Sequence, residues 1–289
     1  RGVEKVIVRE HLEKRLLKGE KLRFKFGIDP TGSKLHIGHM VVMRKLREFQ
    51  KLGATVIFLI GDFTAKIGDP TGRLTSRPAL SEKEIQENMK EYQQQASKIL
   101  DIKKAEIRYN SEWFGKMTLK ELLILSMQVT YQQVSAREDF KKRLARDEDF
   151  TVQEFLYPVL QGYDSVALKA DIEIGGSDQE FNMLMGRRIQ RKYGQKPQDV
   201  ITCPLLLGTD GRKMSKSYNN YIGVMDAPSE MFGKVMSASD EVICDYFKLC
   251  TDVPMKEIEE MKSAMKKGLL NPRDAKARLA REIVTIYHR

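Results

Sequence analysis

Residues 22–60, LRFKFGIDPTGSKLHIGHMVVMRKLREFQKLGATVIFLI, decide the fold of this chain. Apolar and polar side chains alternate over 21–28, which predicts a strand whose two faces meet different surroundings. Apolar residues then recur at near-helical spacing over 37–52, and Gly53 ends that helix. The run at 55–60 is apolar throughout, as is typical of a parallel strand covered on both faces.

A strand, a helix and a second strand within about forty residues form a unit whose crossover is right-handed. We therefore predict an α/β fold with a Rossmann-like, doubly wound parallel sheet. Shorter segments complete the pattern: a polar helix over 80–100, strands over 105–109 and 200–207, a mostly helical stretch over 118–194, and charged helices after Pro228, most clearly at 256–267 and 275–287.

Two domains are expected from this order. Residues 1–224 would form the Rossmann-like domain that carries the active site, with a helical connective insertion at about 100–194. Residues 225–289 would form a mostly helical domain. Because the helical pattern reaches Arg289 without a stop signal, we expect that domain to be truncated and more chain to follow in the whole protein.

Composition narrows the class of protein without naming its function. No apolar run in the 289 residues approaches the roughly 18 needed to cross a membrane, and the first residues lack a signal peptide. Three cysteines, Cys203, Cys244 and Cys250, form no metal-ligand pair and fit a reducing cytoplasm. The formal charge of +10 favours a polyanionic partner, although charge alone does not establish one.

The first candidate site is the segment DPTGSKLHIGH at 29–39, between the first strand and the first helix. Ligands of open α/β sheets bind at this end of the strands, and a helix start favours phosphate. His36 and His39 can donate hydrogen bonds to phosphate oxygens, and Gly38 leaves room for a nucleotide. A metal site is the alternative, but no carboxylate or thiol nearby offers obvious further ligands.

The second candidate site is KMSKS at 213–217. Two lysines three residues apart on a loop that contains Gly211 and hydroxyl side chains can close over a pyrophosphate as negative charge develops on it. Taken alone, such a loop is more often simply solvated.

In this order and spacing the two segments resemble the paired signatures of class I aminoacyl-tRNA synthetases. The resemblance implies a Rossmann catalytic domain that binds ATP with Mg²⁺ as co-substrate, with no metal ligands from the protein and no tightly bound cofactor. A small-molecule adenylyltransferase would share only the histidine signature. A non-catalytic RNA-binding relative would be expected to lose catalytic side chains, and both signatures are intact here.

Three further segments bear on the substrate. GDPTG at 68–72 precedes Arg73 and Arg77, and GGSDQ at 175–179 is a glycine-rich turn with a carboxylate. Tyr157, Gln161 and Asp164 are spaced i, i+4, i+7, so they share one face of a helix. That polar face either points to water or needs a polar ligand, because burying it unpaired is costly.

These segments are similar to the bacterial-type tyrosyl-tRNA synthetases over about 22–222. The resemblance implies that L-tyrosine is held by Asp69, Tyr157, Gln161, Asp164 and Gln179, with Asp164 on the phenol. It implies that ATP is bound by Gly27, Asp29, His36, Gly38, His39, Gly176, Asp178 and Lys216. It implies that Thr31, His36, His39, Lys213, Lys216, Ser217, Arg73 and Arg77 act on the phosphates.

Lys25 departs from the usual pattern, in which many members carry a tyrosine there as second partner of the phenol. A lysine could still donate to the phenol oxygen, or it could point elsewhere. The tryptophanyl enzymes are the nearest alternative and would need an acceptor for an indole N–H. The resemblance also implies tRNA(Tyr) as partner and a homodimer joined through the insertion.

Overall fold

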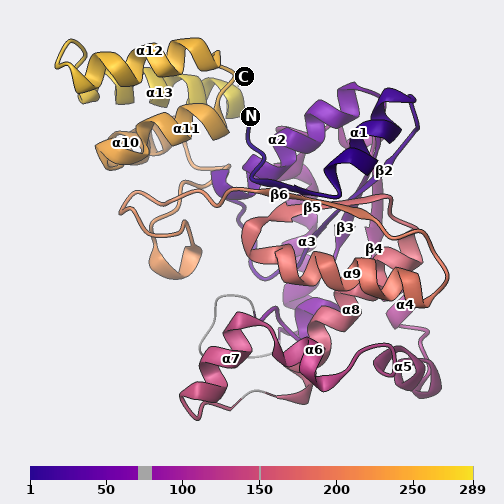
Figure 1. Ribbon diagram of the computed structural model, residues 1–289. Helices are drawn as coiled ribbons and strands as arrows, with labels where there is room; N and C mark the ends of the chain where they lie inside the picture. The colour runs from indigo at the N-terminus through magenta and orange to yellow at the C-terminus, as the bar shows by residue number, and fades with distance from the viewer. Residues whose placement is uncertain (71–79, 150, 289) are drawn as a thin grey trace.

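The computed structural model describes residues 1–70, 80–149 and 151–288. Its centre is a six-stranded sheet in the order β1-β6-β5-β2-β3-β4 (Figure 1). The strands are β1 (Lys5–Ile7), β2 (Arg23–Ile28), β3 (Thr55–Ile60), β4 (Glu106–Tyr109), β5 (Ile172–Gly176) and β6 (Asp199–Cys203). Neighbouring strands are parallel except β1, which runs antiparallel to β6. The predicted doubly wound α/β fold is confirmed.

Helices flank this sheet and continue beyond it. They are α1 (Arg9–Leu17), α2 (Ile37–Lys51), α3 (Glu82–Ala96), α4 (Ser111–Phe114), α5 (Leu119–Ser126), α6 (Tyr131–Ser135), α7 (Glu138–Ala145), α8 (Val152–Leu168), α9 (Glu180–Lys192), α10 (Pro228–Ser237), α11 (Ile243–Cys250), α12 (Met255–Lys266) and α13 (Pro272–Tyr287). None of the described helices is long and apolar enough to cross a membrane.

Local sequence sets the starts of several helices. A serine or threonine is followed three residues later by Glu or Gln before α3, α5, α6 and α8, and in each case a capping box forms. At α8, for example, Thr151 accepts from the backbone of Glu154, whose side chain accepts from the backbone of Thr151. These reciprocal bonds satisfy backbone donors that a helix start otherwise leaves unpaired.

One strand lies where a mostly helical stretch was expected. Residues 172–176 form β5, which is parallel to both β2 and β6, so the expectation of helix up to about residue 194 is wrong there. The strand has five residues between the long helices α8 and α9, and it contains the charged Glu173, which hides its apolar character. The division into domains at residue 224 stays a prediction.

The strand order reverses between β2 and β5. From β2 the chain moves outward to β3 and β4, and it then returns to the other side of β2 to form β5 and β6. In doubly wound sheets this switch point leaves a crevice at the carboxyl ends of the two strands, where ligands bind.

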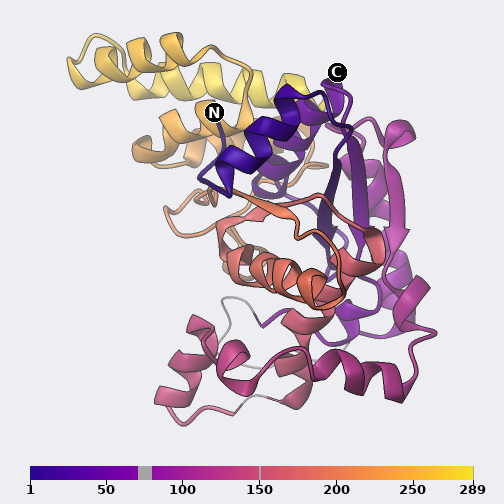
Figure 2. The same cartoon turned by 45° about the vertical axis from the view of Figure 1, so that its right-hand side comes forward.

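Each face of the sheet has its own helical cover. Phe24 and Phe26 of β2 belong to a core that includes the α2 side chains, whereas Ile57 and Leu59 of β3 pack with Leu168 of α8 on the opposite face. Figures 1 and 2 show α5–α7 projecting at one end of the molecule and α10–α13 packed at the other.

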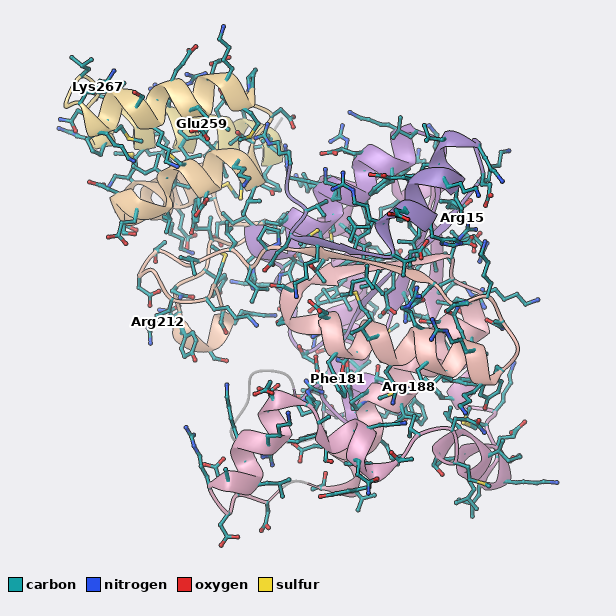
Figure 3. The ribbon with its side chains drawn as sticks, viewed as in Figure 1. Arg15, Phe181, Arg188, Arg212, Glu259 and Lys267 are labelled. Carbon is teal, nitrogen blue, oxygen red and sulfur yellow. The ribbon has the colours of Figure 1, made fainter. Side chains whose placement is uncertain are left out.

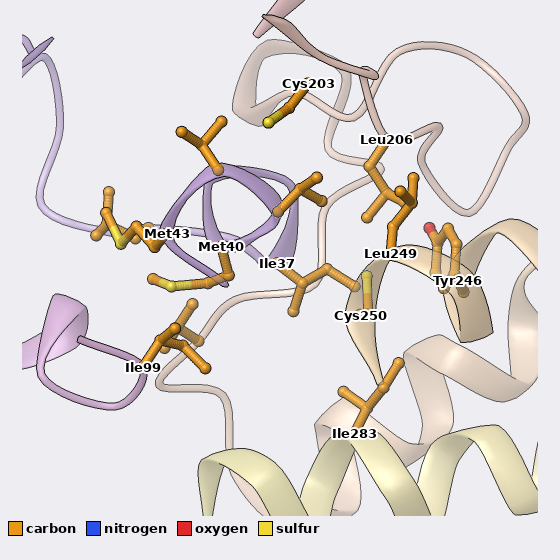
Figure 4. Close-up of a cluster of buried hydrophobic side chains, with 14 of the residues drawn as sticks. Ile37, Met40, Met43, Ile99, Cys203, Leu206, Tyr246, Leu249, Cys250 and Ile283 are labelled. Atoms are coloured by element: carbon orange, nitrogen blue, oxygen red, sulfur yellow. The ribbon is translucent and has the colours of Figure 1, made fainter. Parts of the chain in front are cut away.

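The core of the sheet continues into the C-terminal helices. In Figure 4, Ile37 of α2 lies beside Cys250 of α11, with Ile283 of α13 nearby. These buried side chains belong to one cluster with the strand residues. The C-terminal helices therefore share a hydrophobic core with the α/β part.

Replacing Ile283 by Ala tests this shared core. The side chain is fully buried, so we expect the free energy of unfolding to fall by about 2–5 kcal/mol in urea titrations followed by circular dichroism. The matched control is Leu269→Ala, whose side chain is 79% exposed and should change stability by less than about 0.5 kcal/mol. A separate early transition of the C-terminal helices, with the main transition unchanged, would contradict the shared core.

Candidate active site

A cavity of about 340 Å³ opens at the switch point, between the ends of β2 and β5. Its wall contains every sequence-predicted site residue that the structure describes. These are Lys25, Gly27, Asp29, Thr31, His36, Gly38, His39, Asp69, Tyr157, Gln161, Asp164, Gly176, Asp178, Gln179, Lys213, Lys216 and Ser217. Arg73 and Arg77 lie outside the described residues. The histidine and lysine signatures therefore face one cavity.

The histidine segment is held in place by a distant part of the chain. The backbone N–H of Ile37 donates to Ile222, and that of Val224 donates to Leu35, so the two segments pair around His36 and Gly223. The side chain of Asp226 accepts from the backbone of Gly223 and from Lys234 of α10, at 2.7 Å each. No pattern in the sequence predicts this support, because the pairing is long-range.

The two imidazoles lie close together, with ring centroids 3.8 Å apart. His39 Nδ1 accepts from the backbone N–H of His36 at 3.1 Å, so the proton of neutral His39 lies on Nε2. His36 Nδ1 is buried and has no partner among the described residues. A Cβ at position 38 would lie 2.9 Å from that atom, so Gly38 makes room first for the His36 ring.

Both imidazoles are neutral at pH 7. Burial, and after it the nearby charge of Lys216, lower the pKa of His39 to about 3. Burial, the His39 ring and Lys216 together hold the pKa of His36 well below its usual value. Each ring can therefore donate one hydrogen bond, and the positive charge at this lip of the cavity comes from the lysines.

The lysine loop is docked against the histidine side of the cavity. Lys213 Nζ pairs with Asp178 at 2.6 Å, and Lys216 Nζ donates to the backbone oxygen of Gly32 at 3.4 Å. The side chain of Asn220 stabilises the loop through two hydrogen bonds: it donates to Asp210 and accepts from the backbone N–H of Ser215. Figure 3 shows Arg212 at the outer edge of this loop.

The inner part of the cavity offers acceptors for a cation. Tyr157 donates to Asp29 Oδ2 at 2.9 Å, and Gln179 donates to Asp69 Oδ2 at 2.7 Å. Gln161 Oε1 is buried and has no partner among the described residues. A buried acceptor without a donor is costly, so a ligand that brings N–H groups would stabilise this region.

Asp164 lies on the same helix face and is 3% exposed. Its Oδ1 accepts from Trp113 Nε1 at 2.9 Å. Burial raises the pKa of Asp164 to about 7, although Lys25 and the Trp113 hydrogen bond oppose the rise. Sequence reasoning missed Trp113, because the 51 residues that separate it from Asp164 leave no spacing pattern to detect. The only available signal was that it is the one tryptophan in the chain.

Lys25 has no N–H left for a ligand. Its Nζ lies 3.0 Å from the backbone oxygen of Gln161, 2.9 Å from Ser165 Oγ and 2.9 Å from Glu173 Oε1. An ammonium has three donors, and these contacts use all three. In this structure Lys25 therefore donates to protein groups, and its role toward a ligand hydroxyl stays a prediction.

Taken together, the cavity has acceptors at its inner end and donors with positive charge at its outer lip. A small zwitterion beside a polyphosphate would match both ends. The described residues contain no group of three His, Cys, Asp or Glu side chains that could hold a metal ion. The lysines at the outer lip are suited to stabilising a phosphate that carries negative charge.

Comparisons with known proteins agree with this chemistry. The family model described as class I tRNA synthetases (W and Y) matches residues 17–289. The chain is 53% identical to a tyrosine–tRNA ligase of Carboxydothermus hydrogenoformans, covering all of this chain and 71% of that protein. It is 52% identical to a tyrosine–tRNA ligase of Thermotoga maritima, covering 100% and 72%.

Solved structures give the same picture. The tyrosyl-tRNA synthetase of Archaeoglobus fulgidus, solved with L-tyrosine, superposes with a TM-score of 0.82 at 26% identity over 99% of this chain and 94% of that one. A truncated mitochondrial tyrosyl-tRNA synthetase of Coccidioides posadasii gives 0.78 at 27% identity over 99% and 85%.

The neutral state of His39 predicts how stability depends on pH. The unfolded chain binds a proton at this residue below about pH 6.5, whereas the folded chain resists it down to about pH 3. Stability is therefore lost as pH falls through this window, by about 1.4 kcal/mol per pH unit from this residue. In urea titrations at pH 6, 5 and 4, His39→Asn should lose stability less steeply than the parent protein. Equal slopes would mean that folded His39 accepts the proton.

Proposed function

Because the chain belongs to the class I tRNA synthetases for tryptophan and tyrosine, and among them to the tyrosine–tRNA ligases, we propose that this cavity catalyses both steps of tyrosine attachment to tRNA. In the first step L-tyrosine and ATP give tyrosyl-adenylate and pyrophosphate. In the second, tyrosine passes to the 3′ end of tRNA(Tyr). The observation that best supports this is the meeting of residues 36–39 and 213–217 over one cavity of about 340 Å³, whose wall also contains Tyr157, Gln161 and Asp164.

Tyrosine would lie with its ammonium at the inner acceptors and its phenol at Asp164. The buried Gln161 Oε1, which has no hydrogen-bond donor within the described part of the chain, supports the first assignment, together with Tyr157 and Asp69 of the same cavity wall. Trp113 holds Asp164 Oδ1, and the carboxylate can accept a further bond from the phenol. Phenylalanine would leave that buried carboxylate without its partner, which disfavours its binding. An indole could also donate there, but the relatives at about 50% identity are tyrosine ligases.

ATP would occupy the side of the cavity between Gly27 and the two signatures. A Cβ added at Gly27 would meet, among the described residues, only Leu59 at 3.8 Å, so the space in front of it is open to a ligand. Asp178 would bind the ribose. Since Lys213 pairs with Asp178 in this structure, it would have to leave that carboxylate to reach the phosphates. Binding of ATP would thus be coupled to movement of the lysine loop.

Catalysis would need no covalent enzyme intermediate. The tyrosine carboxylate attacks the α-phosphate in line, the bond to the β-phosphate oxygen breaks, and pyrophosphate leaves. His36 and His39 would donate neutral N–H bonds, while Lys213 and Lys216 would supply positive charge as the leaving group becomes more negative. Thr31 and Ser217 add hydroxyl donors nearby. Mg²⁺ would enter bound to the ATP phosphates.

The amino-acid acceptor and the assembly are inferred from other features. The excess of ten positive charges favours a polyanion such as tRNA, and both ATP and tRNA are at hand in the cytoplasm. Helix α5 and the Met127 that caps its C-terminus expose a row of apolar side chains, Leu119, Leu123, Ile124 and Met127. A second copy of the chain would cover them, since exposed apolar patches of this kind mark interaction surfaces.

Pyrophosphate exchange tests the catalytic assignment. Lys216→Ala and His36→Ala should each lower kcat by about 10²–10³, because each removes a donor that acts mainly in the transition state. Tyrosine affinity, measured by calorimetry without ATP, should stay close to the parent value. The control Lys34→Ala changes an exposed lysine of the same segment as His36 and should retain full activity. If exchange and tyrosine affinity fell by the same factor, the transition-state role would be refuted.

Leu123→Asp tests the proposed dimer. A stable interface buries about 800 Å² on each partner, and a charge in the middle of the α5 row would oppose it. We expect the parent chain to run as a dimer in light scattering and the variant to run as a monomer. Leu17→Asp, at an 89% exposed position on α1, is the matched control and should not change the mass. A monomeric parent chain would rule the α5 interface out.

A further inference from the structure

A buried ion pair lies beneath the pocket that we assign to tyrosine. Lys25 of β2 and Glu173 of β5 are directly opposite each other across the two strands at the switch point. Their charged atoms are 2.9 Å apart, and the two residues are 0% and 2% exposed. Burying two charges in the centre of a sheet is expensive, and a pair of apolar residues would often be as stable. This position therefore calls for an explanation other than packing.

Both members of the ion pair form hydrogen bonds with α8, the helix that carries Asp164. Lys25 holds the backbone oxygen of Gln161 and the hydroxyl of Ser165, and Ser165 also donates to Glu173 at 3.2 Å. Gln161 precedes Asp164 by three residues and Ser165 follows it directly. The turn of α8 that presents Asp164 is thus fixed on both sides to the sheet.

We infer that Lys25 is a positioning residue for tyrosine recognition: from its buried pair with Glu173 it fixes the Asp164 turn of α8 and supplies the positive charge that faces the Asp164 carboxylate. This inference rests on the proposed function, and it assigns Lys25 no contact with the substrate. At a pH above the pKa of Asp164, the phenol hydroxyl then meets a charged acceptor. Hydrogen bonds to a charged acceptor are about twice as strong as those between neutral groups.

The groups that face Asp164 come from several elements. Lys25 approaches from β2 and Glu173 from β5, Trp113 from α4 and Asn110 from just before α4. Tyr157 adds a phenol from α8 itself. Burial raises the pKa of Asp164, Lys25 lowers it more than Glu173 raises it, and the two hydrogen bonds lower it further. Lys25 supplies the positive charge among these groups.

The two partners should therefore act in opposite directions when replaced one at a time. With Lys25→Met the positive charge is gone, and the pH at which tyrosine affinity is half lost should move upward. With Glu173→Gln the positive charge is no longer offset, and that midpoint should move downward. For the parent chain, a pKa of Asp164 of about 7 implies a Kd for tyrosine about tenfold weaker at pH 6 than at pH 8.

The experiment is calorimetric titration with L-tyrosine from pH 5.5 to 8.5. The ionisation of free tyrosine is common to all variants and cancels in the comparison. The double variant Lys25→Met with Glu173→Gln leaves no unpaired buried charge, so it should fold even where a single variant does not. Its midpoint should lie above that of the parent chain, because Lys25 has the larger influence. Lys45→Met, a buried lysine of α2 away from the cavity, is the control and should keep the parent midpoint.

The outcomes separate three cases. The inference is supported if the pH at which tyrosine affinity is half lost moves up for Lys25→Met and for the double variant. It also requires that this pH move down for Glu173→Gln wherever that variant folds. Affinities reduced by one factor at every pH, with all midpoints at the parent value, would show a structural role only and overturn it. A parent chain without tyrosine-dependent pyrophosphate exchange would instead refute the proposed function on which the inference rests.

Discussion

The parallel pairing of β2 with β5 is the constraint on which the rest of this structure depends. Because it joins the first half of the sheet to the last, the strand order reverses there, and the carboxyl ends of both strands open into one cavity. The histidine segment follows β2, and the turn that carries Asp178 follows β5. Segments more than a hundred residues apart in the chain thus meet because two strands lie side by side.

Charge is distributed over this cavity by burial. The imidazoles are kept neutral, and the lysines of residues 213–217 remain cationic at the edge, so donors and charge are supplied by different side chains. At the other end a carboxyl group is buried beside an ion pair. The same low-dielectric environment that makes isolated charges costly makes each remaining hydrogen bond more selective.

The sequence predicted most of the sheet and the location of the site, because both depend on local patterns. Alternation predicted β2, an unbroken apolar run predicted β3, and the two signatures marked the outer lip of the cavity. It did not predict β5, in which Glu173 interrupts the apolar pattern, because the partner that makes this charge tolerable, Lys25, lies about 150 residues earlier. The contact between Trp113 and Asp164 could not be predicted for the same reason, because residues that pair at long range leave no periodic pattern in the sequence.

The pairing of Leu35 and Ile37 with residues 222–224 has a mechanical consequence. These hydrogen bonds join the backbone at His36 to the segment that leads into α10. Asp226 connects that segment to α10 itself, because it accepts from the backbone of Gly223 and from Lys234. Hydrogen bonds and one ion pair therefore connect α10, the first of the C-terminal helices, to the backbone of His36 in the cavity wall. A macromolecule that bound to α10 and displaced it would therefore move His36 first, the residue that we propose donates to the phosphates of ATP.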